Sequence, residues 1–183
     1  TASGKVLKAE VTALPKPVEL PGPWNLSFPP GWGTPGTVSL DKLSSWTEHP
    51  NQAVKYFSGT ATYDKAFAWD AAKRQGDRHV LDLGDLRSLA EVELNGKDLG
   101  VLWKPPFRVD VTAALRSGQN RLRVKVTNLW PNRLIGDEQL PADREWKGKE
   151  LKQWPQWVLD AKPSPTGRFT FTPWHHWTKD DPL

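Results

Sequence analysis

Tryptophan is the residue type that stands out for its chemistry, with eleven copies in 183 residues. Its side chain offers a large flat apolar face and one N–H donor. Sugar binding needs such a face against the C–H groups of a pyranose ring, with polar side chains nearby for the hydroxyls. Two groups in the sequence have this make-up. The first is Trp103 and Trp130 with Asn132, Arg133, Asp137 and Glu138, and the second is Trp174, His175 and Trp177.

Each of these rings also has a second interpretation. Tryptophan is highly buried on average in folded proteins. Any single ring could therefore fill the core or pack beneath a loop. The clustering of the rings with polar residues is the reason for treating them as candidate binding residues.

Two pairs of neighbouring carboxyl groups in the sequence are candidate catalytic groups. Glycoside cleavage needs two carboxyl groups roughly 5 to 10 Å apart, one of them with a raised pKa. Asp137 with Glu138, and Asp180 with Asp181, are adjacent, so in an extended segment their side chains diverge. We therefore predict no catalytic residue, although two distant carboxylates could still meet in space. The alternative role of Asp137 and Glu138 is hydrogen bonding within a loop, for example with Arg133 or Arg144.

Composition excludes several other classes of function. The absence of cysteine excludes thiolate catalysis, zinc fingers and iron–sulfur clusters. His175, His176 and Asp180 do not have the spacing of a zinc site. The 25 basic residues are interspersed with 21 acidic ones, giving a net charge of +4. This mixed surface argues against nucleic acid as a partner, and no apolar run approaches the roughly 20 residues of a membrane-spanning helix.

The elements that must position these residues are predicted to be strands. The first 50 residues are rich in proline, which lacks a donor N–H and avoids central strands. We predict one strand there, over 6–13, followed by long ordered loops at the sheet edges. Residues 40–46 could form a short helical turn capped by Asp41.

From residue 54 the apolar pattern alternates with period two. Asn95-Gly96 predicts a two-residue type I′ turn between two strands, with Ala90, Val92 and Leu94 on the buried face. If the strand with Arg121, Arg123 and Lys125 pairs with the strand carrying Glu91 and Glu93, these charges would be cross-strand pairs on an exposed face.

The later part of the chain is broken by prolines from 130 to 165, and Phe169 and Phe171 then alternate with threonines, which predicts a last strand. Several short alternating strands without a long helical period predict an all-β antiparallel two-sheet β-sandwich of jelly-roll type. We expect one domain over 1–183, with an N-terminal strand and loops over 1–50 and the sandwich core over 54–172.

Two longer segments resemble a known family. FSGTATYDKAFAW (57–69) and the segment VLDLGDLRSLAEVELNGKDLGVLWKPPFRVDVTAALRSGQNRLRVKVTNLWPNRLIGDEQLP (80–141) are similar to the sugar-binding β-sandwich of glycoside hydrolase family 2, which has the galactose-binding fold. NLWPNRLIGDEQLP and the closing FTFTPWHHWTKDDPL more specifically resemble the C-terminal module of α-L-rhamnosidase-like enzymes of glycoside hydrolase family 106.

The resemblance implies more than the residues do. It implies that this chain is a module excised from a larger bacterial enzyme, whose catalytic residues lie in another domain. It also implies export of that enzyme, to the periplasm, the cell surface or the medium, to act on plant or algal polysaccharide. No cofactor is expected to be required, and a structural calcium ion, which such sandwiches often hold, stays open.

The sequence is compatible with three functions for this chain. The first is a carbohydrate-binding module for a polysaccharide, with rhamnose-containing polymers as one candidate ligand. The second is a structural sandwich that packs on a catalytic domain without binding sugar. The third is a small jelly-roll glycosidase or lyase.

Overall fold

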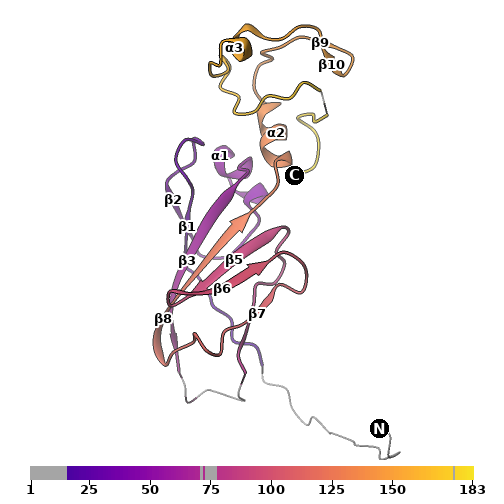
Figure 1. Ribbon diagram of the computed structural model, residues 1–183. Coiled ribbons are helices and arrows are strands. Elements are labelled where there is room, and N and C mark those ends of the chain that lie inside the picture. The colour runs from indigo at the N-terminus through magenta and orange to yellow at the C-terminus, as the bar shows by residue number, and fades with distance from the viewer. Residues whose placement is uncertain (1–15, 71, 73–77, 175) are drawn as a thin grey trace, which may run out of the picture.

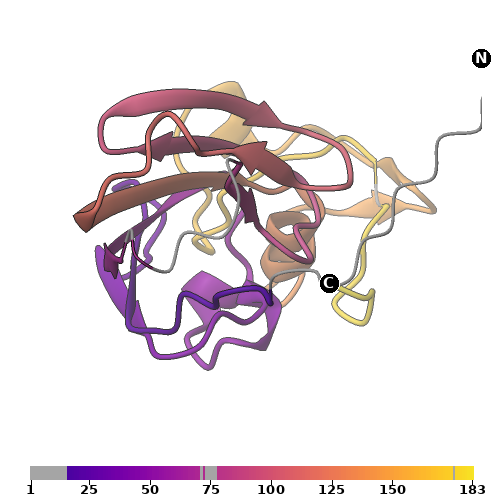
Figure 2. The same ribbon diagram turned by 90° about the horizontal axis from the view of Figure 1, so that it is seen from below.

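The main sheet of the molecule has six antiparallel strands. The structure is a computed structural model that describes residues 16–70, 72, 78–174 and 176–183. The strands follow one another across the sheet in the order β2-β1-β3-β8-β5-β6 (Figures 1 and 2). Their bounds are β1 (Trp24–Ser27), β2 (Thr37–Leu40), β3 (Thr60–Trp69), β5 (Leu89–Leu94), β6 (Lys97–Leu102) and β8 (Gly118–Thr127).

A second, smaller sheet packs against the first. It consists of β4 (Val80–Asp82) and β7 (Arg108–Asp110), which pair antiparallel. Leu81 and Val109 of this sheet pack on a core that the main sheet supplies with Val92, Leu94 and Leu122. Burying one face of each sheet in this way is what stabilises a sandwich. The predicted all-β sandwich is confirmed, with two layers of very unequal size.

The Asn95-Gly96 turn is confirmed. Both residues have positive φ, 54° and 81°, as a type I′ turn requires. The Asn95 side chain also donates to the Ala114 carbonyl over 2.8 Å and accepts from the Arg121 N–H over 2.9 Å. The turn is therefore attached to β8 as well as joining β5 to β6.

The predicted pairing of opposite charges is confirmed in register. Glu91 lies opposite Lys125 and Glu93 opposite Arg123. Lys125 Nζ is 3.1 Å from a Glu91 carboxylate oxygen. Arg123 instead makes its ion pair across the other edge of β8, with Asp64 of β3 at 3.1 Å.

The N-terminal region is more regular than predicted. The expected strand over 6–13 lies outside the described residues, whereas β1 and β2 form where loops were expected. The prolines flank β1 and none lies within it, so Trp24 and Leu26 alternate into the core and β1 has a bonded neighbour on both sides.

The predicted helical turn over 40–46 is wrong, because Leu40 belongs to β2. A 3-10 helix, η1, spans Trp46–Glu48 and is capped by Ser45 instead of Asp41. The helix α1 (Gln52–Lys55) follows, and the Asn51 side chain accepts from the N–H groups of Ala53 and Val54.

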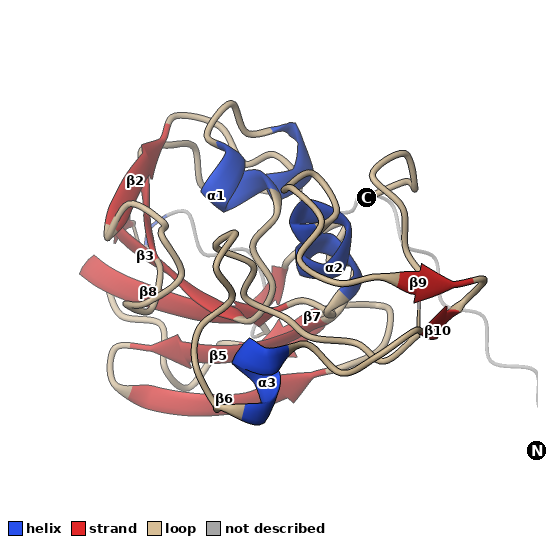
Figure 3. Cartoon of the chain, turned by 90° about the horizontal axis from the view of Figure 1, so that it is seen from above, coloured by secondary structure: helices blue, strands red, loops and turns tan. Residues whose placement is uncertain are grey.

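The last third of the chain forms a lobe beyond the end of the sandwich (Figure 1). It contains α2 (Pro131–Asp137), β9 (Trp146–Lys147), β10 (Glu150–Leu151) and α3 (Gln156–Leu159). Seen from above in Figure 3, α1 and α2 lie next to each other where the lobe meets the sandwich. The strands of the main sheet thus come from residues 24–127, which differs from the expected core over 54–172.

The strand predicted around Phe169 and Phe171 is absent from this described part of the lobe. The N–H groups of Phe169 and Thr170 donate to one Asp137 carboxylate oxygen, over 3.0 and 2.8 Å. These donors are used by a side chain, so the segment joins no ladder of strands. The alternation of apolar and polar residues is therefore present here without a strand, and Phe169 lies at a bend of the backbone.

Candidate functional site

A groove of about 630 Å³ lies between two loops at the side of the sandwich. We call it the Trp103 groove, and it is lined by residues of the segments 82–88, which begins with the last residue of β4, and 103–108, which runs from the end of β6 to the first residue of β7. These segments are far apart in sequence. They meet because β4 pairs with β7, which places Asp82 opposite Arg108.

The base of the groove is held by the core and by hydrogen bonds. Phe107 is buried, and its carbonyl accepts the Leu83 N–H over 2.9 Å. One Asp82 oxygen accepts the Gly84 N–H over 2.9 Å, and the other accepts from Arg108 Nε over 2.7 Å. The bond from Gly84 and then the bond from Arg108 lower the pKa of Asp82 below its usual value, because both stabilise the ionised form. At neutral pH this wall therefore carries the ionised carboxylate of Asp82 beside the guanidinium of Arg108.

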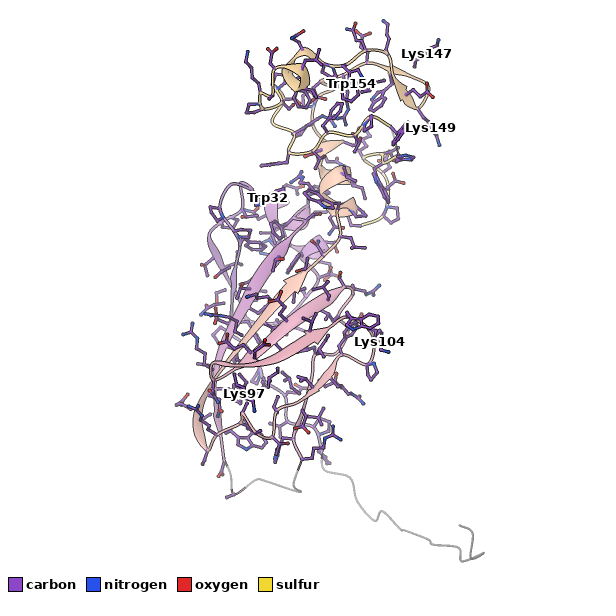
Figure 4. All side chains as sticks on the ribbon, viewed as in Figure 1. Trp32, Lys97, Lys104, Lys147, Lys149 and Trp154 are labelled. Carbon is purple, nitrogen blue, oxygen red and sulfur yellow. The ribbon has the colours of Figure 1, made fainter. Side chains whose placement is uncertain are left out.

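Trp103 is the prominent apolar group of this groove, and its side chain is 68% exposed. The ammonium of Lys104 lies 5.2 Å from the centre of its ring. Figure 4 shows Lys104 projecting from the loop after β6. On the opposite wall Arg87 contacts Asp85 at 3.3 Å, and both side chains are exposed. A flat ring with charged donors and acceptors within one groove has the composition of a sugar-binding site.

The polar residues grouped with Trp130 in the sequence serve the protein itself. Arg133 and Asp137 form a buried ion pair with 3.0 Å between Nε and Oδ1, and Asp137 is 1% exposed. Glu138 contacts Arg168 at 2.8 Å and Arg144 at 3.2 Å. We therefore remove Arg133, Asp137 and Glu138 from the sugar-binding candidates. The alternative role is observed for Glu138, which accepts a hydrogen bond from Arg144. Asp137 instead forms an ion pair with Arg133 and accepts its hydrogen bonds from Phe169 and Thr170.

The remaining members of that group are accessible to different degrees. Trp130 is 54% exposed and stands at the start of α2, while Asn132 is half-buried. Neither lines the Trp103 groove. The structure therefore does not bring Trp103 and Trp130 into one site.

The second predicted group lies in the lobe. Trp174 is 57% exposed and forms an isolated backbone bridge with Glu150. Trp177 is half-buried and lines a cavity of about 10 Å³, the size of one water molecule. His175 lies outside the described residues. Of the described members of this group, Trp174 offers an exposed ring and Trp177 lines a cavity far too small for a sugar.

Two features were missed by the sequence analysis. The wall with Asp82, Arg87 and Arg108 was missed because no local motif marks it, and only strand pairing brings it to Trp103. A set of contacting rings that includes Trp32 and Phe169 was missed for the same reason. Both could have been found only from the pairing of distant segments.

The described part of the chain shows neither a metal-binding cluster nor a membrane-spanning helix. No three histidine, aspartate or glutamate side chains gather there in a way that could hold a metal ion. A calcium ion bound mainly by backbone carbonyls stays a prediction. Within the same residues, no helix has the length and apolar character needed to cross a bilayer.

The fold and the sequence define the class of this domain. The chain belongs to the family described as glycosyl hydrolase 2 galactose-binding domain-like, whose model matches residues 41–162. It is 48% identical over 182 residues to a protein of Formosa agariphila named "Putative beta-glucuronidase". That match covers 99% of this chain and 16% of the relative.

Solved structures give the same fold. A rhamnosidase from Novosphingobium sp. PP1Y matches 92% of this chain and 16% of its own length, with 33% identity and a TM-score of 0.60. A β-glucuronidase from Ruminococcus gnavus in complex with C6-substituted uronic isofagomine matches 60% of this chain and 21% of its own length, with 22% identity and a TM-score of 0.50. This second likeness concerns the fold alone. The chain spans about a sixth of the curated relative and of the rhamnosidase.

Proposed function

We propose that this chain is a non-catalytic carbohydrate-binding domain of a larger glycoside hydrolase, and that it binds a plant or algal polysaccharide in the Trp103 groove. The single observation that carries the proposal is a tryptophan, 68% exposed, at the edge of a 630 Å³ groove with charged walls. Keeping the apolar face of a tryptophan in water is unfavourable. Covering that face with the C–H face of a sugar removes it from water and so favours binding.

The relatives support the larger context of the proposal. A domain that makes up a sixth of proteins named as a glucuronidase and a rhamnosidase fits an accessory role beside a catalytic domain. Rhamnose-containing polymers are therefore the first ligands to test. The proposal also places the longer protein where polysaccharide is found, outside the cytoplasm.

The groove carboxylates favour binding over catalysis. A glycosidase needs a general acid with a raised pKa. The pKa of Asp82 is instead lowered, and Asp85 pairs with Arg87. The small-hydrolase alternative therefore finds no support in this groove.

The test is binding of the purified chain to a panel of rhamnogalacturonan, ulvan, pectin, xylan and mannan. Binding is measured by the change in tryptophan fluorescence and by affinity electrophoresis. We expect weak affinity for single sugars, about −4 kcal/mol, and stronger retention by polymers because several units bind together. Trp103→Ala should weaken polymer binding about tenfold or more, the effect typical of a central aromatic contact.

Trp130→Ala is the matched control, because Trp130 is similarly exposed but lies outside the groove. It should bind as the unaltered chain does. Absence of binding by a folded chain to every polymer would show the proposal to be wrong. New reducing ends in the same samples would show that the chain is an enzyme.

A further inference from the structure

Three aromatic rings from distant segments meet where the lobe joins the sandwich. We call them the aromatic junction: Trp32 from the β1–β2 loop, Trp130 at the start of α2, and Phe169 from the lobe. The rings of Trp32 and Phe169 are stacked, with centroids 5.5 Å apart and planes at 26°. Trp32 and Trp130 lie 5.8 Å apart and are tilted by 52°. Figure 4 shows Trp32 at the lobe end of the sandwich, well away from Lys104 of the groove.

The junction leaves an apolar surface open to solvent. Trp130 is 54% exposed and Phe169 is 46% exposed, and Leu129, next to Trp130 in the chain, is exposed as well. Single exposed apolar residues are ordinary on protein surfaces, but a contiguous aromatic patch marks a contact surface. Tryptophan is also among the residue types that contribute most to interfaces.

The rings are held in place from below. Trp32 contacts the ring of the fully buried Phe57 at 6.1 Å. The Arg133 guanidinium lies 5.2 Å from the centre of the Phe169 ring, and Arg133 itself is fixed by its buried ion pair with Asp137. A surface whose side chains are already immobilised loses little conformational entropy when a partner binds.

The geometry suits a protein partner better than a sugar. The Phe169 ring contacts both Trp32 and the Arg133 guanidinium, and Trp32 also contacts Phe57 and Trp130, so these two rings are less open to a sugar than Trp103, which is 68% exposed. The surface also crosses from the sandwich to the lobe, so an occupant would contact both parts at once. Interfaces between domains of one chain bury roughly 600 to 1,500 Å², and the fully buried centre of an interface is more apolar than the rest of the protein surface.

We infer that the aromatic junction is the surface on which another domain of the same longer protein packs. This inference rests on the part of the proposed function that makes the chain a domain of a larger glycoside hydrolase. The match to the rhamnosidase leaves out only 8% of this chain, less than the length of the lobe, so it must include part of the segment that supplies Trp130 and Phe169. Most of that relative, like most of the curated one, lies outside the matched region. The partner that we infer is a domain corresponding to part of that remaining length.

The experiment compares oxidation of individual tryptophans in two forms of the protein. The 183-residue chain and the longer natural protein are treated with hydroxyl radicals, and the oxidised fraction of each tryptophan is measured by mass spectrometry. We expect oxidation of Trp130 to fall several-fold in the longer protein. Trp103, which is comparably exposed in the chain, is the internal control and should be oxidised equally in both forms.

Equal oxidation of Trp130 in the two forms would overturn the inference. A dimer of the 183-residue chain in sedimentation velocity that disappears in Trp130→Ala would also overturn it, because the occupant would then be a second copy. Protection of Trp103 instead of Trp130 would contradict both this inference and the sugar-binding role of the groove. Loss of glycan binding in Trp103→Ala, measured separately, tests the proposed function without involving the junction.

A variant gives a second, independent readout. Trp130→Ala in the longer protein should speed thermal inactivation several-fold, while the melting temperature of the isolated 183-residue chain stays nearly unchanged because the ring is mostly exposed there. Trp103→Ala should change neither the inactivation rate of the longer protein nor the melting temperature of the isolated chain. An unchanged inactivation rate in the Trp130 variant of the longer protein would speak against packing at this surface.

Discussion

Asp137 shows how one residue can join two segments of the chain. Its carboxylate is 1% exposed, so its charge has lost its hydration, a cost that only close partners offset. The partners are Arg133 at 3.0 Å and three donors from Phe169 and Thr170 at 2.7 to 3.0 Å. This single side chain ties α2 to the segment that carries Phe169.

Replacing Asp137 should therefore be severe. Asp137→Ala leaves the buried Arg133 without its counter-charge and two backbone N–H groups without their acceptor. We expect a loss of about 3 to 5 kcal/mol in the free energy of unfolding, measured by urea denaturation. Asp85→Ala, at an exposed carboxylate, should change it by less than about 0.5 kcal/mol. Equal effects of the two substitutions would contradict the structural role of Asp137.

At the scale of elements, the position of α2 depends on a glycine. A Cβ atom at Gly136 would lie 2.5 Å from the Cβ atom of Tyr56, which ends α1, and 2.5 Å from Arg133 Nη2. The Arg133 side chain is held by its buried ion pair with Asp137, and the Tyr56 Cβ atom is fixed by its own backbone, so neither gives way easily. Because position 136 has no side chain, α2 can approach α1 closely. This close approach brings the lobe next to the sandwich.

Gly136→Ala tests this close approach, because two effects oppose each other. Alanine favours a helix over glycine by about 1 kcal/mol, whereas overpacking of this kind costs roughly 1 to 3 kcal/mol. We expect the clash to dominate and the melting temperature to fall. A rise in melting temperature would show that α2 and α1 can separate freely.

Across the whole molecule, stability in acid depends on exposed carboxylates with lowered pKa values. Hydrogen bonds from Thr112 and then Arg78 lower the pKa of Asp110 from 3.8 to about 2. The pKa values of Asp82, Glu145 and Asp160 are lowered too, by hydrogen bonds from Gly84, Lys152 and Gln156 respectively. A lowered pKa means that the folded state binds fewer protons than the unfolded state, so folding becomes less favourable as the pH falls.

The expected result is a melting temperature that declines as the pH falls from near 4 toward 2. For Asp110 the contribution is fully present above its unfolded pKa of 3.8 and is lost as the pH passes through about 2. Asp110→Asn should melt lower than the unaltered chain at neutral pH and should show a shallower decline in acid. Thermal unfolding by circular dichroism at a series of pH values checks this, and parallel curves for the two proteins would contradict it.

Much of the sandwich was predictable because its signals are local. The Asn95-Gly96 turn follows from the positive φ that these residue types tolerate, and the buried row Ala90, Val92 and Leu94 follows from the two-residue period of a strand. The pairing of Glu91 with Lys125 followed from charge complementarity once the strand order was assumed. Each of these depends on a few neighbouring residues, or on one pair of strands.

The candidate site was only partly predictable. Trp103 was recognisable as a ring in a loop, but the wall with Asp82 and Arg108 forms only when β4 pairs with β7. The acidic residues grouped with Trp130 were assigned to sugar from their type, while their burial could not be read from the sequence.

The sequence by itself determined the strands around the Asn95-Gly96 turn, the turn and the class of fold, because these follow from residue size, polarity and backbone preference over short stretches. Only the tertiary structure decided which tryptophans face solvent, which carboxylates form ion pairs with buried arginines, and which distant loops form the groove and the aromatic junction. The physical reason is that burial and ion pairing are properties of neighbours in space. Packing of the lobe against the sandwich supplies the neighbours of the junction, and strand pairing supplies those of the groove.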